Sequence, residues 1–157
     1  MTTTPAANQS QFAAVRDAIP ALSREVHGKP LVYLDAAATT PRPQPVLDAI
    51  MHYETHCPAN VHRGVHELSA EATAAFEGAR RSIANFFGGD AHQLVFTRGT
   101  TESINLVANS WGSSLRPGDE ILISALEHHA NIVPWQLACE RTGAVLRVVD
   151  VDSNANL

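Results

Sequence analysis

The stretch QLVFTRGTTESINLVANSWGSSLRPGDEILISALEHHANIVPWQLACERTGAVLRVVDV, residues 93–151, decides the expected fold. Short runs rich in valine, isoleucine and leucine alternate with longer segments whose apolar residues recur every three or four positions. The runs predict strands over 93–97, 120–126 and 144–151, and the longer segments predict helices over 100–111 and 131–142. This alternation is typical of an α/β fold, in which strands are buried between helices.

The residues before this stretch predict one short strand and two further helices. LVYLD at 31–35 has the composition of a strand, and a Gly-Lys-Pro turn at 28–30 precedes it. A helix is expected over roughly 45–56, because a proline that suits a first helical turn opens it. A longer helix is expected over 68–87, before a Gly-Gly pair. Its apolar stripe consists of Leu68, Ala72, Phe76, Ala79, Ile83 and Phe86.

The two ends of the chain are expected to differ from its middle. Residues 1–10 are polar and are predicted to be frayed, and 11–19 predict a short amphipathic helix. We therefore expect an N-terminal arm with a short helix over 1–30 and the first part of a larger domain over 31–157. Only the polar DSNANL follows the last predicted strand, so the architecture is expected to be incomplete within these residues.

Composition narrows the function classes. The 157 residues are 45% apolar and 17% charged, with a net charge of -5 in no long block, so neither nucleic acid nor a membrane surface is an expected partner. No apolar run is long enough to cross a bilayer, and the first residues lack the features of a signal peptide. Cys57 and Cys139 are too few for a disulfide framework. A cytoplasmic location is expected.

The strand-to-helix junction FTRGTTESINL is the first candidate site. Gly99 allows close approach of a ligand to the backbone, and Thr100 and Thr101 stand at the predicted helix start. Free N–H groups and hydroxyls at a helix N-terminus form a site for phosphate. Threonine is also common there as an ordinary cap, so the junction alone leaves both interpretations open.

The second candidate follows the strand predicted at 120–126, where Glu127, His128 and His129 precede the next helix. Ligands of open α/β sheets collect at the carboxyl ends of strands. A histidine at such a place can stack on an aromatic ligand or transfer protons. Two surface or capping histidines are the simpler interpretation from these residues alone.

A third cluster invites a zinc interpretation. His52 and His56 lie four positions apart, as do His62 and His66, and Cys57 is close in sequence. No second cysteine or carboxylate completes a recognised ligand spacing, so no metal site is expected. A ligand pocket or a subunit contact is the preferred role for the segment NVHRGVHELS.

Together, four blocks resemble the SUF-type (group II) cysteine desulfurases, in the class V aminotransferase group of fold type I enzymes. They are ALSREVHGKPLVYLDAAATT, NVHRGVHELSAEAT, LVFTRGTTESINLVANSWG and LEHHANIVPWQ. The resemblance implies the N-terminal part of a pyridoxal-phosphate-dependent transferase, whose mixed seven-stranded sheet is flanked by helices. It also implies that the strands at 120–126 and 144–151 are neighbours, and that the strand at 93–97 lies apart from them.

The resemblance implies roles for residues at both junctions. In that family, the residues matching Thr100 and Thr101 help to hold the phosphate of pyridoxal 5'-phosphate. The residue matching His128 stacks on the pyridine ring and takes part in proton transfers.

The resemblance also implies a second group of functional residues. Ala36 and Ala37 are expected near the substrate side of the pocket. His62 and Arg63 are expected beside the active site at the interface of a homodimer.

The reaction implied is the removal of sulfur from L-cysteine. Alanine leaves, and a persulfide on an enzyme cysteine passes its sulfur to an acceptor protein of the SUF system for iron–sulfur cluster assembly. The lysine that holds the cofactor in an aldimine and the persulfide cysteine lie in family segments that these residues do not include. Lys29, the one lysine of the chain, precedes the first predicted strand and is no substitute. We therefore expect the isolated 157 residues to be inactive and not to fold stably.

Three alternatives stay open from the sequence. Another class V enzyme, such as a selenocysteine lyase, has a similar N-terminal part. A non-catalytic module that keeps the phosphate site or the dimer surface is the second alternative, and a small metal-binding protein is the third.

Overall fold

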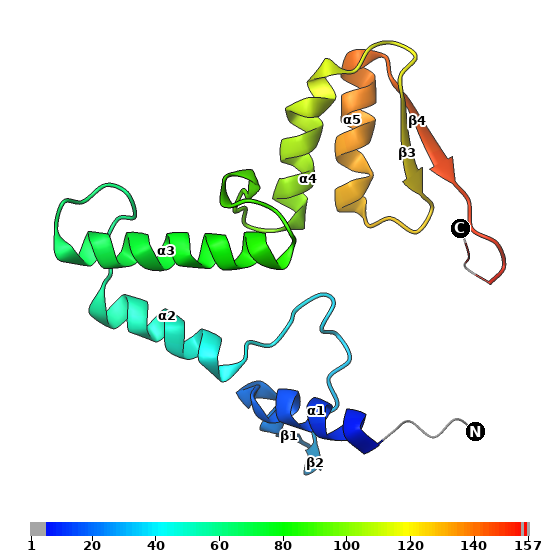
Figure 1. Cartoon of the computed structure of the whole chain (residues 1–157). Coiled ribbons are helices and arrows are strands. Elements are labelled where there is room, and N and C mark those ends of the chain that lie inside the picture. The colour runs from blue at the N-terminus through cyan, green and yellow to red at the C-terminus, as the bar shows by residue number, and fades with distance from the viewer. Residues whose placement is uncertain (1–5, 155, 157) are drawn as a thin grey trace. The chain divides into compact units, whose positions relative to one another are not determined.

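The computed structural model describes residues 6–154 and 156, which form two compact units, one ending at Ala91 and one beginning at His92 (Figure 1). Helices and strands occur together, which confirms the expected α/β class. The division expected after residue 30, between an N-terminal arm and a larger domain, does not coincide with the boundary between these two units and stays a prediction. We call the two parts the first and the second unit.

The first unit contains three α-helices and a small hairpin in its described part. Its elements are α1 (Ala6–Asp17), a 3-10 turn (Pro20–Ser23), β1 (Glu25–Val26), β2 (Lys29–Pro30), α2 (Gln44–His56) and α3 (Glu67–Phe86). The helices expected over 45–56 and 68–87 are confirmed to within a residue or two. Gly88 follows α3 with a φ of 71°, as expected for a glycine that ends a helix.

The N-terminal helix is longer than the sequence suggested. Residues 6–10 were expected to be frayed, but α1 begins at Ala6. That prediction is wrong for these residues, and residues 1–5 lie outside the described part. Polar residues such as asparagine, glutamine and serine are compatible with helix when an apolar segment continues it, so polarity alone did not indicate fraying.

The strand predicted over 31–35 is absent, and a hairpin precedes it instead. β1 and β2 pair antiparallel around His27 and Gly28, which have φ values of 53° and 70°. Two successive positive φ values are the geometry of a tight hairpin turn. The expected turn at 28–30 is therefore displaced by one residue. Residues 31–35 are irregular, because a strand needs a neighbouring strand to receive its backbone hydrogen bonds.

Residues 57–64 form a loop between α2 and α3, and α3 holds it in place. The Ser69 side chain is 1% exposed; its Oγ accepts from the Gly64 N–H at 2.9 Å and donates to the Asn60 carbonyl at 2.7 Å. Of the predicted apolar stripe on α3, Ala72 is buried, whereas Phe86 is 84% exposed. The stripe thus forms as a helix face but is only partly covered within the first unit.

Gly64 offers a test of this packing. A Cβ added at Gly64 would lie 2.5 Å from Ser69 Cβ, so we expect Gly64→Ala to displace the buried serine and to destabilise the protein by about 1–3 kcal/mol. Gly78→Ala is the control, because a Cβ there meets only the end of Arg81 at 3.9 Å and alanine favours helix. Thermal unfolding of the two variants of the complete protein measures the difference, and equal midpoints would contradict the packing.

The second unit is a β-α-β arrangement preceded by a helix. Its elements are α4 (Thr100–Asn109), β3 (Glu120–Ser124), α5 (Val133–Thr142) and β4 (Val145–Val149), with 3-10 turns at Trp111–Ser114 and His129–Asn131. A further 3-10 turn, Ala91–Gln93, spans the boundary between the two units. β3 and β4 are parallel neighbours, with Ile121 opposite Leu146. The helices and strands predicted between 100 and 151 are thus confirmed, with shorter ends, as is the adjacency of the last two strands.

The strand predicted over 93–97 is not formed. Gln93 is the last residue of the 3-10 turn Ala91–Gln93, and residues 94–97 are irregular backbone. Within the described residues, the sheet of the second unit consists of β3 and β4, and residues 93–97 are not part of it. The apolar sequence supplied strand propensity, but strand formation also requires a partner.

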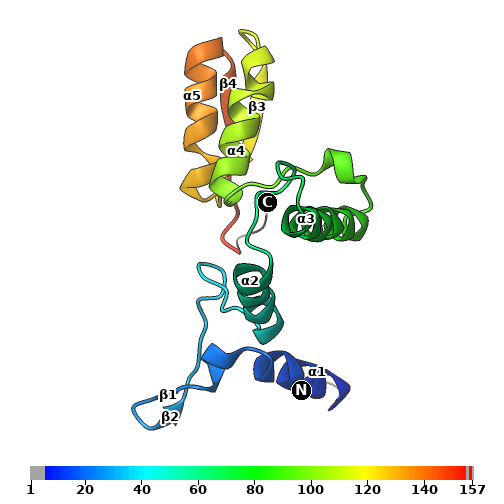
Figure 2. The same cartoon turned by 90° about the vertical axis from the view of Figure 1, so that its left-hand side faces the viewer.

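The packing of the second unit brings its candidate residues to one end. Ala108 of α4 and Ala138 of α5 are fully buried where the two helices pack together. Both strands end, and α4 begins, at the same end of the unit (Figures 1 and 2). The 3-10 turn after β3 packs against α4. The loop that carries His128 and the helix that carries Thr100 therefore share one end of the fold.

Candidate functional site

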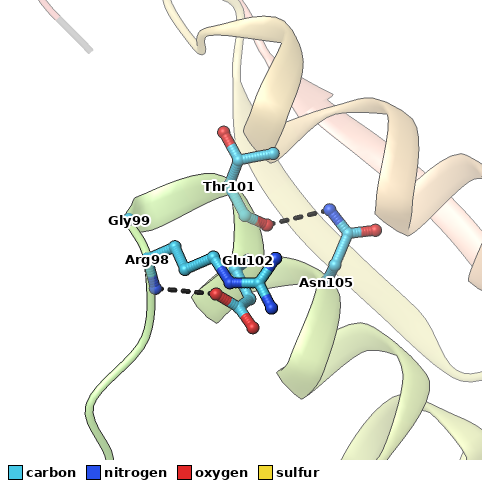
Figure 3. Close-up of a pocket in the computed structure, with 5 residues that line it drawn as sticks. All are labelled: Arg98, Gly99, Thr101, Glu102 and Asn105. Carbon is cyan, nitrogen blue, oxygen red and sulfur yellow. Dashed lines mark hydrogen bonds between the residues drawn. The ribbon is translucent and has the colours of Figure 1, made fainter.

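The N-terminus of α4 lines an open pocket. Arg98, Gly99, Thr101, Glu102 and Asn105 surround a volume of about 490 Å³ (Figure 3). The first helical hydrogen bond runs from the Ser103 N–H to the Gly99 carbonyl at 3.1 Å. The N–H groups of the helix turn before it thus have no acceptor within the helix. Such a turn can bind a phosphate. Thr100 and Thr101 are its first two helical residues, and of the two Thr101 lines the pocket.

One charged side chain at this pocket, Glu102, is held at the first turn of α4. Glu102 Oε2 accepts from the Arg98 backbone N–H at 2.7 Å, so the carboxylate caps the chain before the helix. Figure 3 shows the Thr101 hydroxyl on the side away from Glu102. A Cβ added at Gly99 would meet nothing within 4 Å, which shows open space there. An anion is therefore best accommodated on the threonine side, away from the Glu102 carboxylate.

A chain of hydrogen bonds organises the loop after β3. Ser124 Oγ donates to Glu127 Oε1 at 3.0 Å, and Asn131 Nδ2 donates to Glu127 Oε2 at 2.8 Å. Trp135 Nε1 in turn donates to Asn131 Oδ1 at 2.8 Å. The chain thus joins the end of β3 to the first turns of α5.

His128 lies inside this loop with a defined ring orientation. Its Nδ1 accepts from the Ala130 backbone N–H at 3.1 Å, and its carbonyl accepts from the Asn131 N–H at 2.7 Å. A ring nitrogen that accepts carries no proton, so the neutral ring has its proton on Nε2. The side chain is exposed, so the Nε2–H can face a ligand.

The other predicted site residues belong to the first unit. Ala36 and Ala37 form an exposed turn, in which the Thr40 hydroxyl donates to the Ala36 carbonyl at 2.8 Å. His62 has a φ of 64°, and its Nε2 lies 3.0 Å from Glu77 Oε1. Arg63 next to it is exposed. Of the predicted residues, the structure thus brings together the α4 threonines and the His128 loop.

The model of the family "Aminotransferase class-V" matches residues 32–157, which is most of the chain. The chain belongs to the class-V aminotransferase family. This finding agrees with the resemblance inferred from the four sequence blocks.

Individual relatives of this class-V chain are cysteine desulfurases by name. It is 53% identical over 147 residues to a probable cysteine desulfurase of Mycolicibacterium paratuberculosis, covering 92% of this chain and 22% of that protein. It is 54% identical over 145 residues to a cysteine desulfurase of Klebsiella pneumoniae, covering 91% and 36%. The apo structure of a cysteine desulfurase from Thermococcus onnurineus matches with a TM-score of 0.82 and 38% identity, covering 100% and 36%. The chain thus spans about a third or less of these proteins' length.

A spacing in the sequence of this class-V chain could have predicted part of the hydrogen-bond chain that follows β3. Glu127, Asn131 and Trp135 are spaced by four residues, as side chains on one helical face are. The spacing was missed because Glu127 lies four residues before the helix expected over 131–142, so its side chain was not considered together with that helix.

The third sequence cluster and the apolar runs yield no further site. No group of three or more His, Cys, Asp or Glu side chains able to hold a metal occurs among the described residues of this class-V chain. Cys57 is buried and Cys139 is half-buried. In residues 6–154 and 156, none of the helices has the length and apolar character needed to span a membrane.

The pKa of the Glu127 carboxyl lies below its ordinary value, because Asn131 and then Ser124 donate hydrogen bonds to the ionised form. A carboxyl whose pKa is lowered in the folded protein is ionised, and accepts its hydrogen bonds fully, at any pH above its ordinary pKa of about 4.3. These hydrogen bonds weaken as the pH falls through the lower pKa of the folded state, where the carboxyl becomes protonated. We therefore expect the Trp135 indole N–H signal in NMR spectra to stay constant near neutral pH and to shift only in acid. A shift near neutral pH would contradict this assignment of the acceptor.

Proposed function

We propose that the protein to which these residues belong is a pyridoxal-phosphate-dependent cysteine desulfurase. The observation that carries the proposal is the shared end of the second unit, where the free N-terminal turn of α4 lies at the same end as the His128 loop. The similarity to cysteine desulfurases over 92% of the chain supports the same assignment.

The residues present fit the phosphate of the cofactor. Thr100 and Thr101 provide hydroxyls beside N–H groups that have no acceptor within the helix, and the residue before them has no side chain to block an approach. A dianionic phosphate there is also favoured by the positive end of the helix dipole. When bound, pyridoxal phosphate supplies an electron-withdrawing ring that stabilises negative charge on the α-carbon of an amino acid.

His128 is assigned the second role, on the ring of the cofactor. It follows the carboxyl end of β3, and its imidazole is oriented through Nδ1 by the Ala130 N–H. An imidazole in this state can stack on the pyridine ring and donate or receive a proton through Nε2.

The remaining assignments concern the whole protein. L-cysteine is the proposed substrate, with alanine and an enzyme-bound persulfide as products and a SUF-system acceptor protein as the recipient of sulfur for iron–sulfur cluster assembly. We assign Ala36 and Ala37 to the substrate side, and His62 and Arg63 to the interface of a homodimer. A cytoplasmic location agrees with these roles.

The isolated residues 1–157 are proposed to be inactive. Lys29, the one lysine, lies exposed in the β1–β2 hairpin rather than in the second unit. The buried apolar side chains among the described residues are mostly alanines, with Ile123 the largest, and Phe87 and Leu122 are 76% and 68% exposed. Little apolar area is thus buried, which disfavours independent stability.

We therefore expect purified residues 1–157 to show no cooperative thermal transition, because so few large side chains are buried. Circular dichroism during heating measures this. A sharp transition would show that the residues fold alone. Alanine formed from cysteine by the same material would contradict the proposed inactivity.

The function is tested on the protein expressed from its complete gene. Incubation with L-cysteine and a reductant is expected to yield alanine and sulfide in equal amounts. Absence of alanine from pyridoxal-phosphate-loaded protein would overturn the proposal. Alanine formed from L-selenocysteine but not from L-cysteine would replace it with a selenocysteine lyase, and bound cofactor without turnover would favour a binding module.

A further inference from the structure

We propose that Glu127 and Asn131 form a directed hydrogen-bond pair that positions His128 for proton transfer. The inference rests on the proposed function for the role of His128, but the geometry of the pair stands on its own. Glu127 and Asn131 lie on either side of the histidine in sequence, and their side chains bond to each other at 2.8 Å.

The direction of the pair is fixed from both sides. The indole Nε1–H of Trp135 can only donate, so Asn131 must turn Oδ1 toward it. The amide Nδ2 of Asn131 then faces Glu127, which as a carboxylate can only accept. Neither neighbour tolerates the flipped amide, so the Asn131 side chain has a single orientation.

The same pair anchors both ends of the turn that contains His128. On one side, Glu127 accepts from Ser124 Oγ, and that oxygen accepts from the Leu126 N–H at 3.3 Å. On the other side, the Asn131 backbone N–H donates to the His128 carbonyl at 2.7 Å. The turn between them presents the Ala130 N–H to His128 Nδ1 and so keeps the ring proton on Nε2.

Trp135, the last residue of this hydrogen-bond chain, is fixed by packing. The Trp135 ring lies 3.8 Å from the position of a Cβ at Gly112, in the 3-10 turn that follows α4. The side chain of Asn131 therefore reaches a ring packed on the segment after the phosphate-site helix. Glu127 and Asn131 are positioning residues, because they act on the proposed reaction through His128.

Reversing the pair tests the proposal. Asn131→Asp keeps the acceptor for Trp135 but sets a carboxylate against Glu127. The double variant E127Q/N131D restores a donor and an acceptor in the opposite direction, because the Gln amide donates to the Asp carboxylate and its oxygen still accepts from Ser124. With E127Q as the second single variant, the set forms a double-mutant cycle, which separates the interaction of the pair from the effect of each single change. Glu140→Gln, which removes an exposed carboxylate from α5, is the matched control.

The first measurement is independent of activity. The 15N shifts of the His128 ring in the complete protein, assigned by comparison with H128Q, report which nitrogen carries the proton. We expect an acceptor Nδ1 and a protonated Nε2 in the parent protein and in E127Q/N131D, and mixed signals in N131D. If N131D does not fold, N131A removes both side-chain bonds without adding a charge, and the same mixed signals are expected.

The second measurement is kinetic. We expect N131D to lower kcat about tenfold with KM within about twofold, and E127Q/N131D to recover most of the loss. Parent-like ring signals in a folded N131D or N131A protein would overturn the proposal, as would a double variant no better than N131D. If the parent protein forms no alanine, the proposed function fails, and the ring signals still decide the positioning role.

Discussion

His128→Ala is expected to lower kcat for alanine formation from L-cysteine by about 10²–10⁴-fold, the range typical for loss of a general acid or base. The ring is exposed at the carboxyl end of β3, and Nδ1 is engaged by the Ala130 N–H, so Nε2 is the nitrogen available to substrate. Binding of the cofactor phosphate depends on other groups, so bound pyridoxal phosphate should remain. Steady-state kinetics of the complete protein, together with its absorption spectrum, measure both effects.

His129→Ala is the control for this prediction. The two rings are neighbours, with centroids 5.8 Å apart in an edge-to-face arrangement, and both side chains are exposed. No side-chain hydrogen bond joins His129 to the loop within the described residues, so we expect kcat to change by no more than a few-fold. Equal losses in the two variants would show that the loop as a whole matters, and not the His128 imidazole.

The double substitution T100V/T101V is expected to weaken pyridoxal phosphate binding by about 10²–10⁴-fold. Each hydroxyl can donate to an anionic phosphate, and a hydrogen bond to a charged group contributes about 1.5–3 kcal/mol. Valine keeps the shape of threonine, so the helix should persist. Titration of the apo protein with the cofactor gives the Kd.

Thr55→Val is the control for the threonine pair. Its hydroxyl donates to the Met51 carbonyl within α2, so removing it leaves the proposed phosphate site intact. An unchanged Kd is expected for this variant. If T100V/T101V also binds the cofactor as tightly as the parent protein, the phosphate site is not at the N-terminus of α4.

Local sequence information predicted the helices well and the strands only where a partner exists. The α4 and α5 helices follow from their apolar spacing, and Gly143 ends α5 with a φ of 75°. β3 and β4 form because each supplies the other's backbone hydrogen bonds. The runs at 31–35 and 93–97 have strand composition, but strand pairing depends on residues distant in sequence, which composition does not encode.

The candidate site was predictable in outline and not in detail. Thr100 and His128 were located by two general rules, on helix N-termini and on the carboxyl ends of strands. The roles of Ser124 and Asn131 were not predicted, because side-chain bonds inside an irregular loop depend on its exact path. The left-handed backbone of His62 was also unexpected, since a positive φ is uncommon outside glycine.

The most direct test of the central claim is the pyridoxal phosphate content of the complete protein, compared with that of T100V/T101V prepared in parallel. The account predicts about one bound cofactor per chain in the parent protein and a large loss from the double variant on dialysis. A parent protein that binds no pyridoxal phosphate even when the cofactor is supplied in excess would contradict the account.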